Sequence, residues 1–207
     1  MTRRTDPPGL RFERPLWQAG LKYIGGIDEA GRGAWAGPVS AAVVVLPIKP
    51  SLARTLAGVR DSKQMTPLAR ESWAPRIRAV AAGWGVGFAS NAEIDALGIV
   101  PATRLAATRA LAALAFSPGH LLLDYLFLPD CAIPQTALIK GDQRSLSIAA
   151  ASVLAKTARD ALMRELDSNY PGYGFARHKG YGTPQHRAAL ARLGSCAIHR
   201  HTFSIHP

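Results

Sequence analysis

Residues 23–38 read Tyr23-Ile-Gly-Gly-Ile-Asp-Glu-Ala-Gly-Arg-Gly-Ala-Trp-Ala-Gly-Pro38, and they place two adjacent carboxylates where an apolar run gives way to glycines. The run from Tyr23 to Ile27 is short and apolar, which is typical of a strand. The glycines after it predict a loop in which backbone approaches a ligand closely, and residues 39–46 predict a second apolar strand. Successive strand side chains point to opposite faces, so Asp28 and Glu29 can serve one site only if the strand ends or bulges there.

The same stretch has two other interpretations. A dinucleotide-binding loop needs Gly-x-Gly-x-x-Gly leading into a helix, whereas here the third glycine comes one residue late and a strand-like run follows, which disfavours a nucleotide cofactor. A solvated Asp-Glu pair at the start of a turn is the ordinary fate of such a dipeptide and stays open at this point.

Composition favours a globular protein with a polyanionic partner. The 207 residues are 48% hydrophobic, and 25 Lys and Arg against 14 Asp and Glu give a net charge of +11 and a pI near 10.4. Such a charge favours nucleic acid, although a merely soluble basic protein has it too. The length fits a loosely ordered N-terminal arm over residues 1–20, packed by Leu16 and Trp17, and one catalytic domain over residues 21–207 with a helical segment from about residue 170.

Cysteine usage and hydropathy predict a cytoplasmic protein. Cys131 and Cys196 lie far apart without a Cys-x-x-Cys companion, so neither a zinc site nor a disulfide framework is indicated. The N-terminal residues 1–8 carry charge with no apolar segment after them, and the longest apolar run, 41–46, is far too short to cross a bilayer. We therefore expect neither export nor a membrane partner.

Helix signals frame the remaining chain. Thr66-Pro67 predicts a helix start, with helix to about residue 82. Lys63 just before it is well placed for a phosphate, although taken alone a plain surface lysine is the more common case. A strand is predicted at 84–89 and a turn of helix after Ser90, with Glu93 and Asp95 as first-turn acids outside any site. Further helices are predicted from Pro101 to about residue 114, over 145–166, and over 183–194.

Three strand-like runs each end at an acid. Residues 120–124 close with Asp124, and residues 135–139 lead into Lys140-Gly-Asp142, repeating the pattern seen at Asp28. Open α/β sheets collect ligands at the carboxyl ends of their strands. With Glu29 alongside, the three acids suggest a cage for divalent metal ions, where a single one would indicate only a turn.

Residues 175–182 form a basic loop in which Tyr181 stands between two glycines. An exposed aromatic beside cations resembles a stacking platform for a sugar or base, and a half-buried loop tyrosine is the equal alternative. The histidines near the terminus (His199, His201 and His206) match no ligand spacing, so we interpret them as tail residues that contact solvent or nucleic acid.

From about Tyr23 to Phe203 the chain closely resembles bacterial-type ribonuclease HII, the type 2 ribonucleases H. The resemblance is carried by many motifs in order: Gly26-Ile-Asp-Glu-Ala-Gly-Arg-Gly33, Asp61-Ser-Lys63, Glu93-Ile-Asp95, Leu121 to Asp124, Lys140-Gly-Asp142, Ser147-Ile-Ala-Ala-Ala-Ser152 with Ala155-Lys156, Tyr170-Pro-Gly-Tyr-Gly174, and His178-Lys-Gly-Tyr-Gly-Thr183. Two positions depart from the family pattern: Tyr125 follows the acid where a glycine is common, and Trp35 stands where a smaller aliphatic residue is usual.

The resemblance implies an α/β, RNase H-like fold with a mixed five-stranded sheet flanked by helices and a small C-terminal helical part. It implies a metal-dependent endonuclease that hydrolyses the RNA strand of RNA–DNA hybrids and cuts 5′ to ribonucleotides embedded in duplex DNA, leaving a 3′-hydroxyl and a 5′-phosphate. The implied metal ligands and catalytic residues for two Mn²⁺ or Mg²⁺ ions are Asp28, Glu29, Asp124 and Asp142. The implied substrate-binding residues are Gly31, Arg32, Gly33, Lys63 and Tyr181.

Two other classes of function compete with this one. A catalytically silent nucleic-acid-binding module on the same scaffold would need only the basic surface and would tolerate loss of the acids. An RNase H-like metal nuclease acting on DNA would explain the acids but not Gly31-Arg-Gly33 together with Tyr181. We expect the protein to act as a monomer.

Overall fold

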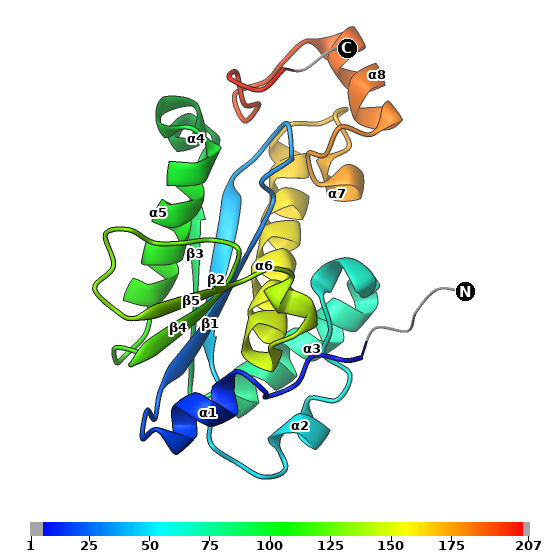
Figure 1. The fold of residues 1–207 in the computed structure, drawn as a ribbon. Coiled ribbons are helices and arrows are strands. Elements are labelled where there is room, and N and C mark those ends of the chain that lie inside the picture. Colours follow the sequence, from blue (N-terminus) through cyan, green and yellow to red (C-terminus); the bar gives the residue numbers. More distant parts are fainter. Residues whose placement is uncertain (1–5, 205–207) are drawn as a thin grey trace.

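A computed structural model describes residues 6–204, which form a five-stranded sheet with helices on both faces (Figure 1). The strands are β1 (Ile24–Ala30), β2 (Val39–Val45), β3 (Gly83–Ala89), β4 (His120–Asp124) and β5 (Gln135–Leu138). The α-helices are α1 (Glu13–Gln18), α2 (Leu52–Thr55), α3 (Pro67–Val80), α4 (Asn91–Leu97), α5 (Ile99–Ala112), α6 (Leu146–Asn169), α7 (Phe175–His178) and α8 (Pro184–Leu193). Two 3₁₀ turns complete the described elements, η1 (Ser62–Gln64) and η2 (Gly141–Gln143).

The sheet is mixed, as the resemblance implied. Its order is β3-β2-β1-β4-β5, with β2 antiparallel to both of its neighbours, β1 and β3, and with β1, β4 and β5 parallel. The loop 31–38 joins the antiparallel strands β1 and β2, whereas the chain reaches β4, parallel to β1, through α4 and α5, and reaches β5 through the segment 125–134. The three parallel strands therefore end at the same edge of the sheet.

Small residues let helix α6 lie very close to one face of the sheet (Figure 1). At Gly26 in β1, an added Cβ would stand 2.3 Å from the backbone carbon of Ser147. The alanines of α6 and the residues of β2 then share a core with α3, including Ala42, Val44 and Ile77. The predicted close packing of the alanine-rich helix on the sheet is confirmed.

Helices α4 and α5 cover the opposite face (Figure 1). Gly85 and Gly87 of β3 face backbone oxygens of α5, where an added Cβ would come within 2.1 Å and 2.2 Å. Side chains from β1, β2 and β4 fill the second core with α5, among them Ile27, Val43 and Leu121. The sheet is thus buried on both faces, which explains why its strands read as nearly continuous apolar runs.

Side-chain caps begin the helices where the sequence predicted. Thr66, Ser90, Ser145 and Thr183 each accept a hydrogen bond from the third backbone N–H that follows. Two expectations differ from the structure. Helix α5 begins at Ile99 rather than at Pro101, and the segment 175–182, predicted as a loop, contains the short helix α7.

The N-terminal segment is more ordered than expected. Residues 13–18 form α1, and the buried carboxylate of Glu13 accepts hydrogen bonds from the hydroxyls of Ser145 and Ser147 and from the Ser147 N–H, at 2.6–3.0 Å. This negative side chain lies at the start of α6, where the helix dipole favours it. Leu16 and Trp17 pack as predicted. Among residues 6–204, no helix is long and apolar enough to cross a membrane.

Candidate active site

Asp28 and Glu29 lie within β1 rather than at its end. The pairing with β2 continues in regular register through Asp28, Glu29 and Ala30, so the expected strand end or bulge at this pair is wrong. Alternation then places Asp28 on the α6 face with Gly26, and Glu29 on the α5 face with Ile27. The two carboxylates therefore point to opposite faces of β1, and only Asp28 belongs to the group of converging aspartates.

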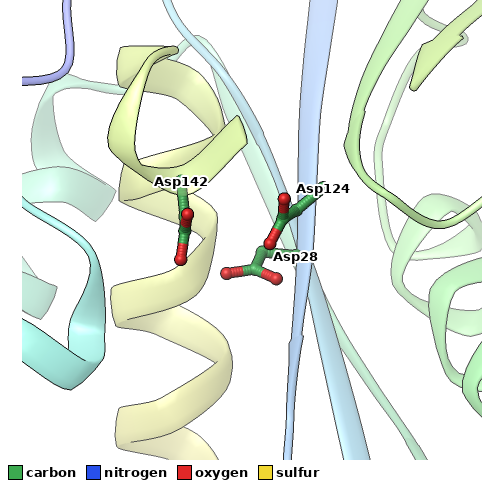
Figure 2. Close-up of side chains that lie close together, drawn as sticks. All are labelled: Asp28, Asp124 and Asp142. Atoms are coloured by element: carbon green, nitrogen blue, oxygen red, sulfur yellow. The ribbon is translucent and has the colours of Figure 1, made fainter. Parts of the chain in front are cut away.

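Parallel strands bring Asp124 beside Asp28. Asp124 is the last residue of β4, and the N–H of Gly141 donates to its Oδ1 at 2.7 Å, which ties the end of β4 to η2. Asp142 lies in η2, and one carboxylate oxygen from each of the three aspartates lies within 4.8 Å of the others. Figure 2 shows the three side chains facing one another, two from adjacent strands and one from the turn above α6.

The electrostatics of this cluster favour cations. Burial, followed by the charges of Glu29 and Asp124, raises the pKa of Asp28 well above its usual value. Burial likewise raises the pKa of Asp124, and burial with the nearby Asp124 and Asp61 raises the pKa of Asp142 to about 7. Each shift reflects the free-energy cost of placing several carboxylates close together in a partly buried site. A bound divalent cation offsets this cost.

Glu29 presents an unsatisfied oxygen beside the cluster. Its Oε1 pairs with the guanidinium of Arg32 at 3.2 Å, while its buried Oε2 has no hydrogen-bond partner among the described residues. Burial, only partly opposed by Arg32, raises the pKa of Glu29. Glu29 lies outside the group of three aspartates whose oxygens converge, but a buried carboxylate oxygen without a hydrogen-bond partner fits hard cations with oxygen ligands such as Mg²⁺ and Mn²⁺.

Lys63 is held near the acids by a residue that sequence reasoning left out of the site. Asp61, which is buried, accepts a hydrogen bond from the Lys63 N–H at 2.9 Å and one from the side chain of Gln143 at 3.3 Å. Burial alone would lower the pKa of Lys63, but the charges of Asp28, Asp61 and the other acids outweigh it and raise the pKa. The Asp-Ser-Lys motif was the available signal, since the aspartate caps the turn that carries the lysine.

The two glycines of the Gly31-Arg-Gly33 segment have different structural roles. Gly31 is buried with φ +93°, and an added Cβ would stand 1.9 Å from Nε of Arg159. Gly33 is exposed, and no heavy atom lies within 4 Å of where its Cβ would be. The open approach expected for a ligand therefore exists at Gly33, whereas Gly31 is needed for the path of the backbone over Arg159.

Tyr181 lies half-buried beside the same loop. Its ring centre is 4.9 Å from Nζ of Lys156 and 5.3 Å from Cζ of Arg159. The N–H of Trp35 donates to the carbonyl of Gly180 at 2.8 Å, which joins the 31–38 loop to the 178–183 loop. The ring thus lies beside two cations, and one of them, Arg159, also contacts Gly31.

The interpretation of the terminal histidines is wrong for His199. This side chain is fully buried, with its Nε2 3.0 Å from Nε2 of His186, and the adjacent Arg200 is also fully buried. His201 is exposed, and His206 lies outside the described residues. No periodicity or motif in the sequence indicates that His199 and Arg200 are buried. Their burial depends on packing of the C-terminal segment against the 31–38 loop, where His199 forms a β-bridge with Ala36.

The two departures from the family pattern have visible consequences. Tyr125 adopts φ +56° directly after Asp124 and is 75% exposed, so the chain carries an aromatic residue where backbone geometry favours glycine. Trp35 packs over Gly182, where an added Cβ would stand 2.4 Å from its ring, so it supports the loop that carries Tyr181.

Comparison with known proteins agrees with this geometry. The family model described as Ribonuclease HII matches residues 25–206. The chain is 53% identical over 199 residues to "Ribonuclease HII" of Chloroflexus aurantiacus, covering 95% of this chain and 93% of that protein. It is also 53% identical over 195 residues to "Ribonuclease HII" of Geobacillus thermodenitrificans, covering 94% of this chain and 73% of the relative.

Solved structures show the same fold. Ribonuclease H2 from Pyrococcus horikoshii superposes with a TM-score of 0.70 at 25% identity, covering 88% of this chain and 94% of that one. The RNase HII of Archaeoglobus fulgidus, solved in complex with PCNA, gives 0.70 at 26% identity, covering 86% and 92%. Ribonucleases HII are metal-dependent endoribonucleases that act on RNA–DNA hybrids, and this chain, matched over nearly its whole length, belongs to the ribonuclease HII family.

Proposed function

We propose that Asp28, Glu29, Asp124 and Asp142 together hold two divalent cations, Mg²⁺ or Mn²⁺, at which the RNA strand is cut. The observation that carries the assignment is the convergence of three carboxylate oxygens within 4.8 Å, with the pKa values of all three aspartates raised. The orphaned Oε2 of Glu29 supports a fourth ligand. When bound, such ions supply an activated water and stabilise charge on the phosphate and the leaving oxygen.

The remaining residues position the substrate. Lys63 extends from the turn beside the acids, where its raised pKa keeps it cationic for contact with a backbone phosphate. Backbone at the open Gly33, with Arg32 beside it, approaches the ribose and reads its 2′-hydroxyl, the group that distinguishes RNA from DNA. Tyr181 packs on the sugar at the junction with DNA, and the buried Gly31 shapes the loop.

This arrangement supports cleavage 5′ to a ribonucleotide embedded in duplex DNA as well as within longer hybrids, leaving a 3′-hydroxyl and a 5′-phosphate. The net charge of +11 supports a duplex partner bound through its phosphates. We further propose that the protein works in the cytoplasm and as a monomer, the latter because one chain supplies all three converging aspartates.

A duplex carrying one ribonucleotide tests the proposal directly. With Mg²⁺ or Mn²⁺ we expect a single cut 5′ to the ribonucleotide, and none with EDTA or in Asp142→Asn. Binding without cleavage under all these conditions would favour the silent binding module. Cleavage of all-DNA duplexes at comparable rates would favour the DNA nuclease.

A further inference from the structure

Two arginines are buried behind the substrate loop without an acidic partner. Arg159 and Arg200 are both 0% exposed, and neither lies within 4.0 Å of a carboxylate oxygen among residues 6–204. Burial lowers the pKa of Arg159, and it lowers the pKa of Arg200 to about 9. Burying unpaired guanidinium groups is costly, so their donors must be satisfied in another way.

The donors of Arg200 bind the backbone of the substrate loop. Its Nη2 donates to the carbonyl of Gly31 at 2.7 Å, its Nη1 to that of Arg32 at 2.8 Å, and its Nε to that of Gly37 at 3.0 Å. Its own N–H donates to the carbonyl of Trp35 at 2.8 Å. One side chain near the C-terminus thus holds both ends of the loop that carries the proposed ribose-reading backbone.

The donors of Arg159 connect that loop to the second substrate segment. Its Nε donates to the carbonyl of Pro38 at 2.8 Å and its Nη2 to that of Ala36 at 3.0 Å, while its Nη1 donates to that of Lys179 at 2.9 Å. The same guanidinium lies 5.3 Å from the ring centre of Tyr181. It fills the space that the missing side chain of Gly31 leaves open.

We propose that Arg159 and Arg200 are positioning residues that fix the 31–38 loop relative to Tyr181, and so set the enzyme's preference for a ribonucleotide next to DNA. The inference rests on the proposed roles of Gly31-Arg-Gly33 and Tyr181. Five charge-assisted hydrogen bonds to carbonyls hold the 31–38 loop from its inner side, and a sixth, to Lys179, ties it to the segment that carries Tyr181. Gly33 is left facing outward. A lysine would keep the charge but could not span three carbonyls, because only the guanidinium is a rigid fork of donors.

Lysine substitutions test the proposal. For Arg200→Lys and Arg159→Lys we expect kcat/KM on a duplex with one ribonucleotide to fall about a hundredfold, because small displacements of a positioning loop are that costly. Cleavage of a long RNA–DNA hybrid should fall less than about tenfold. An all-RNA strand can be cut at many positions, and the substitutions leave the four acidic residues in place. Ile77→Ala, a core change in α3 remote from both loops, is the control for lost stability.

A double variant separates positioning from simple support of the fold. If both arginines act through the loop and Tyr181, then adding Arg159→Lys to Tyr181→Ala should cost little more selectivity than Tyr181→Ala alone. Equal losses of kcat/KM on the single-ribonucleotide duplex and the long hybrid, in proportion to the unfolded fraction as for Ile77→Ala, would overturn the positioning role. Failure of both lysine variants to fold would overturn it as well. A wild-type enzyme that cuts hybrids but not the embedded ribonucleotide would contradict the proposed function itself, independently of any variant.

Discussion

Lowering the pH should destabilise the protein through His186, which lies in a directional chain of hydrogen bonds. The N–H of Cys196 donates to Nδ1 of His199 at 2.8 Å, so Nε2–H of His199 donates to Nε2 of His186 at 3.0 Å. Nδ1–H of His186 then donates to the carbonyl of Tyr181 at 3.0 Å. A proton added to His186 removes the acceptor that His199 needs and places a charge in a fully buried site.

The sign and size of the effect follow from the pKa of His186. Burial, with smaller contributions from His178 and His199, lowers it to about 4, compared with about 6.5 in the unfolded chain. Between these two pKa values the unfolded state binds more protons than the folded state. The contribution of His186 to the free energy of unfolding is therefore fully present above the unfolded pKa and is lost as the pH falls toward the folded pKa. From pH 7 to pH 5 the free energy of unfolding should lose about 2 kcal/mol from this residue.

The measurement must separate His186 from the acids, which act in the opposite direction. The pKa of Asp142 is raised to about 7, so protonation of that residue stabilises the metal-free protein as the pH falls. We therefore compare urea unfolding of the wild type and His186→Asn in EDTA at pH 7, 6 and 5. Asparagine retains a donor for the Tyr181 carbonyl but does not titrate, and the acids contribute equally to both proteins.

The expected result is that the stability advantage of the wild type over His186→Asn shrinks by about 2 kcal/mol between pH 7 and pH 5. An advantage that stays constant across this range would show that His186 takes up its proton equally in the folded and unfolded states. That outcome would refute the hydrogen-bond chain as described.

Asp28→Asn should lower metal-dependent cleavage on the order of a thousandfold, because loss of a ligand removes several kcal/mol of charge stabilisation. Without metal, Asp28→Asn should melt no lower than the wild type. Substantial activity of this variant at saturating Mg²⁺ would contradict the metal site. Affinity of the wild type for the duplex should fall steeply as the salt concentration rises. Lys63→Ala should reduce the slope of log affinity against log salt by about 1. A wild-type affinity that does not change with salt would mean that the net positive charge does not bind nucleic acid. Tyr181→Ala should lose more activity on an embedded ribonucleotide than on a long hybrid, with Tyr181→Phe retaining more, and equal losses would indicate general structural support. Tyr125→Gly should raise the free energy of urea unfolding by about 1 kcal/mol by relieving a left-handed backbone, and a decrease would show that the ring packs usefully.

Local sequence patterns predicted much of the fold and the grouping of the three aspartates. Alternation and apolar runs located the strands, and Thr66 and Ser90 marked helix starts because capping chemistry is encoded within a few residues. Asp124 and Asp142 could be grouped with Asp28 because parallel strands deliver their carboxyl ends to one edge. The roles of the substrate-binding residues stay predictions.

Features that depend on distant contacts were missed. The regular continuation of β1 through Glu29 depends on pairing with β2, which overrides the glycines that follow. The burial of His199 and Arg200 depends on a segment some 160 residues away in the chain, and no local signal distinguishes such residues from an exposed basic tail. Tyr125 shows the same limit, since its left-handed backbone is set by the close approach of β4 and β5.

The bond between Arg200 and Gly31 joins residues 169 positions apart, and it has a consequence for how the enzyme is made. Synthesis proceeds from the N-terminus, so the acids of β1, β4 and η2 emerge from the ribosome before the residue that braces the loop beside them. Arg159 of α6, which precedes Arg200 in the chain, binds the carbonyls of Ala36 and Pro38, whereas those of Gly31, Arg32 and Gly37 depend on Arg200. The carbonyls of Gly31, Arg32 and Gly37 therefore gain their side-chain donor only after Arg200 has been synthesised, and a truncation before Arg200 should leave the 31–38 loop without these three bonds.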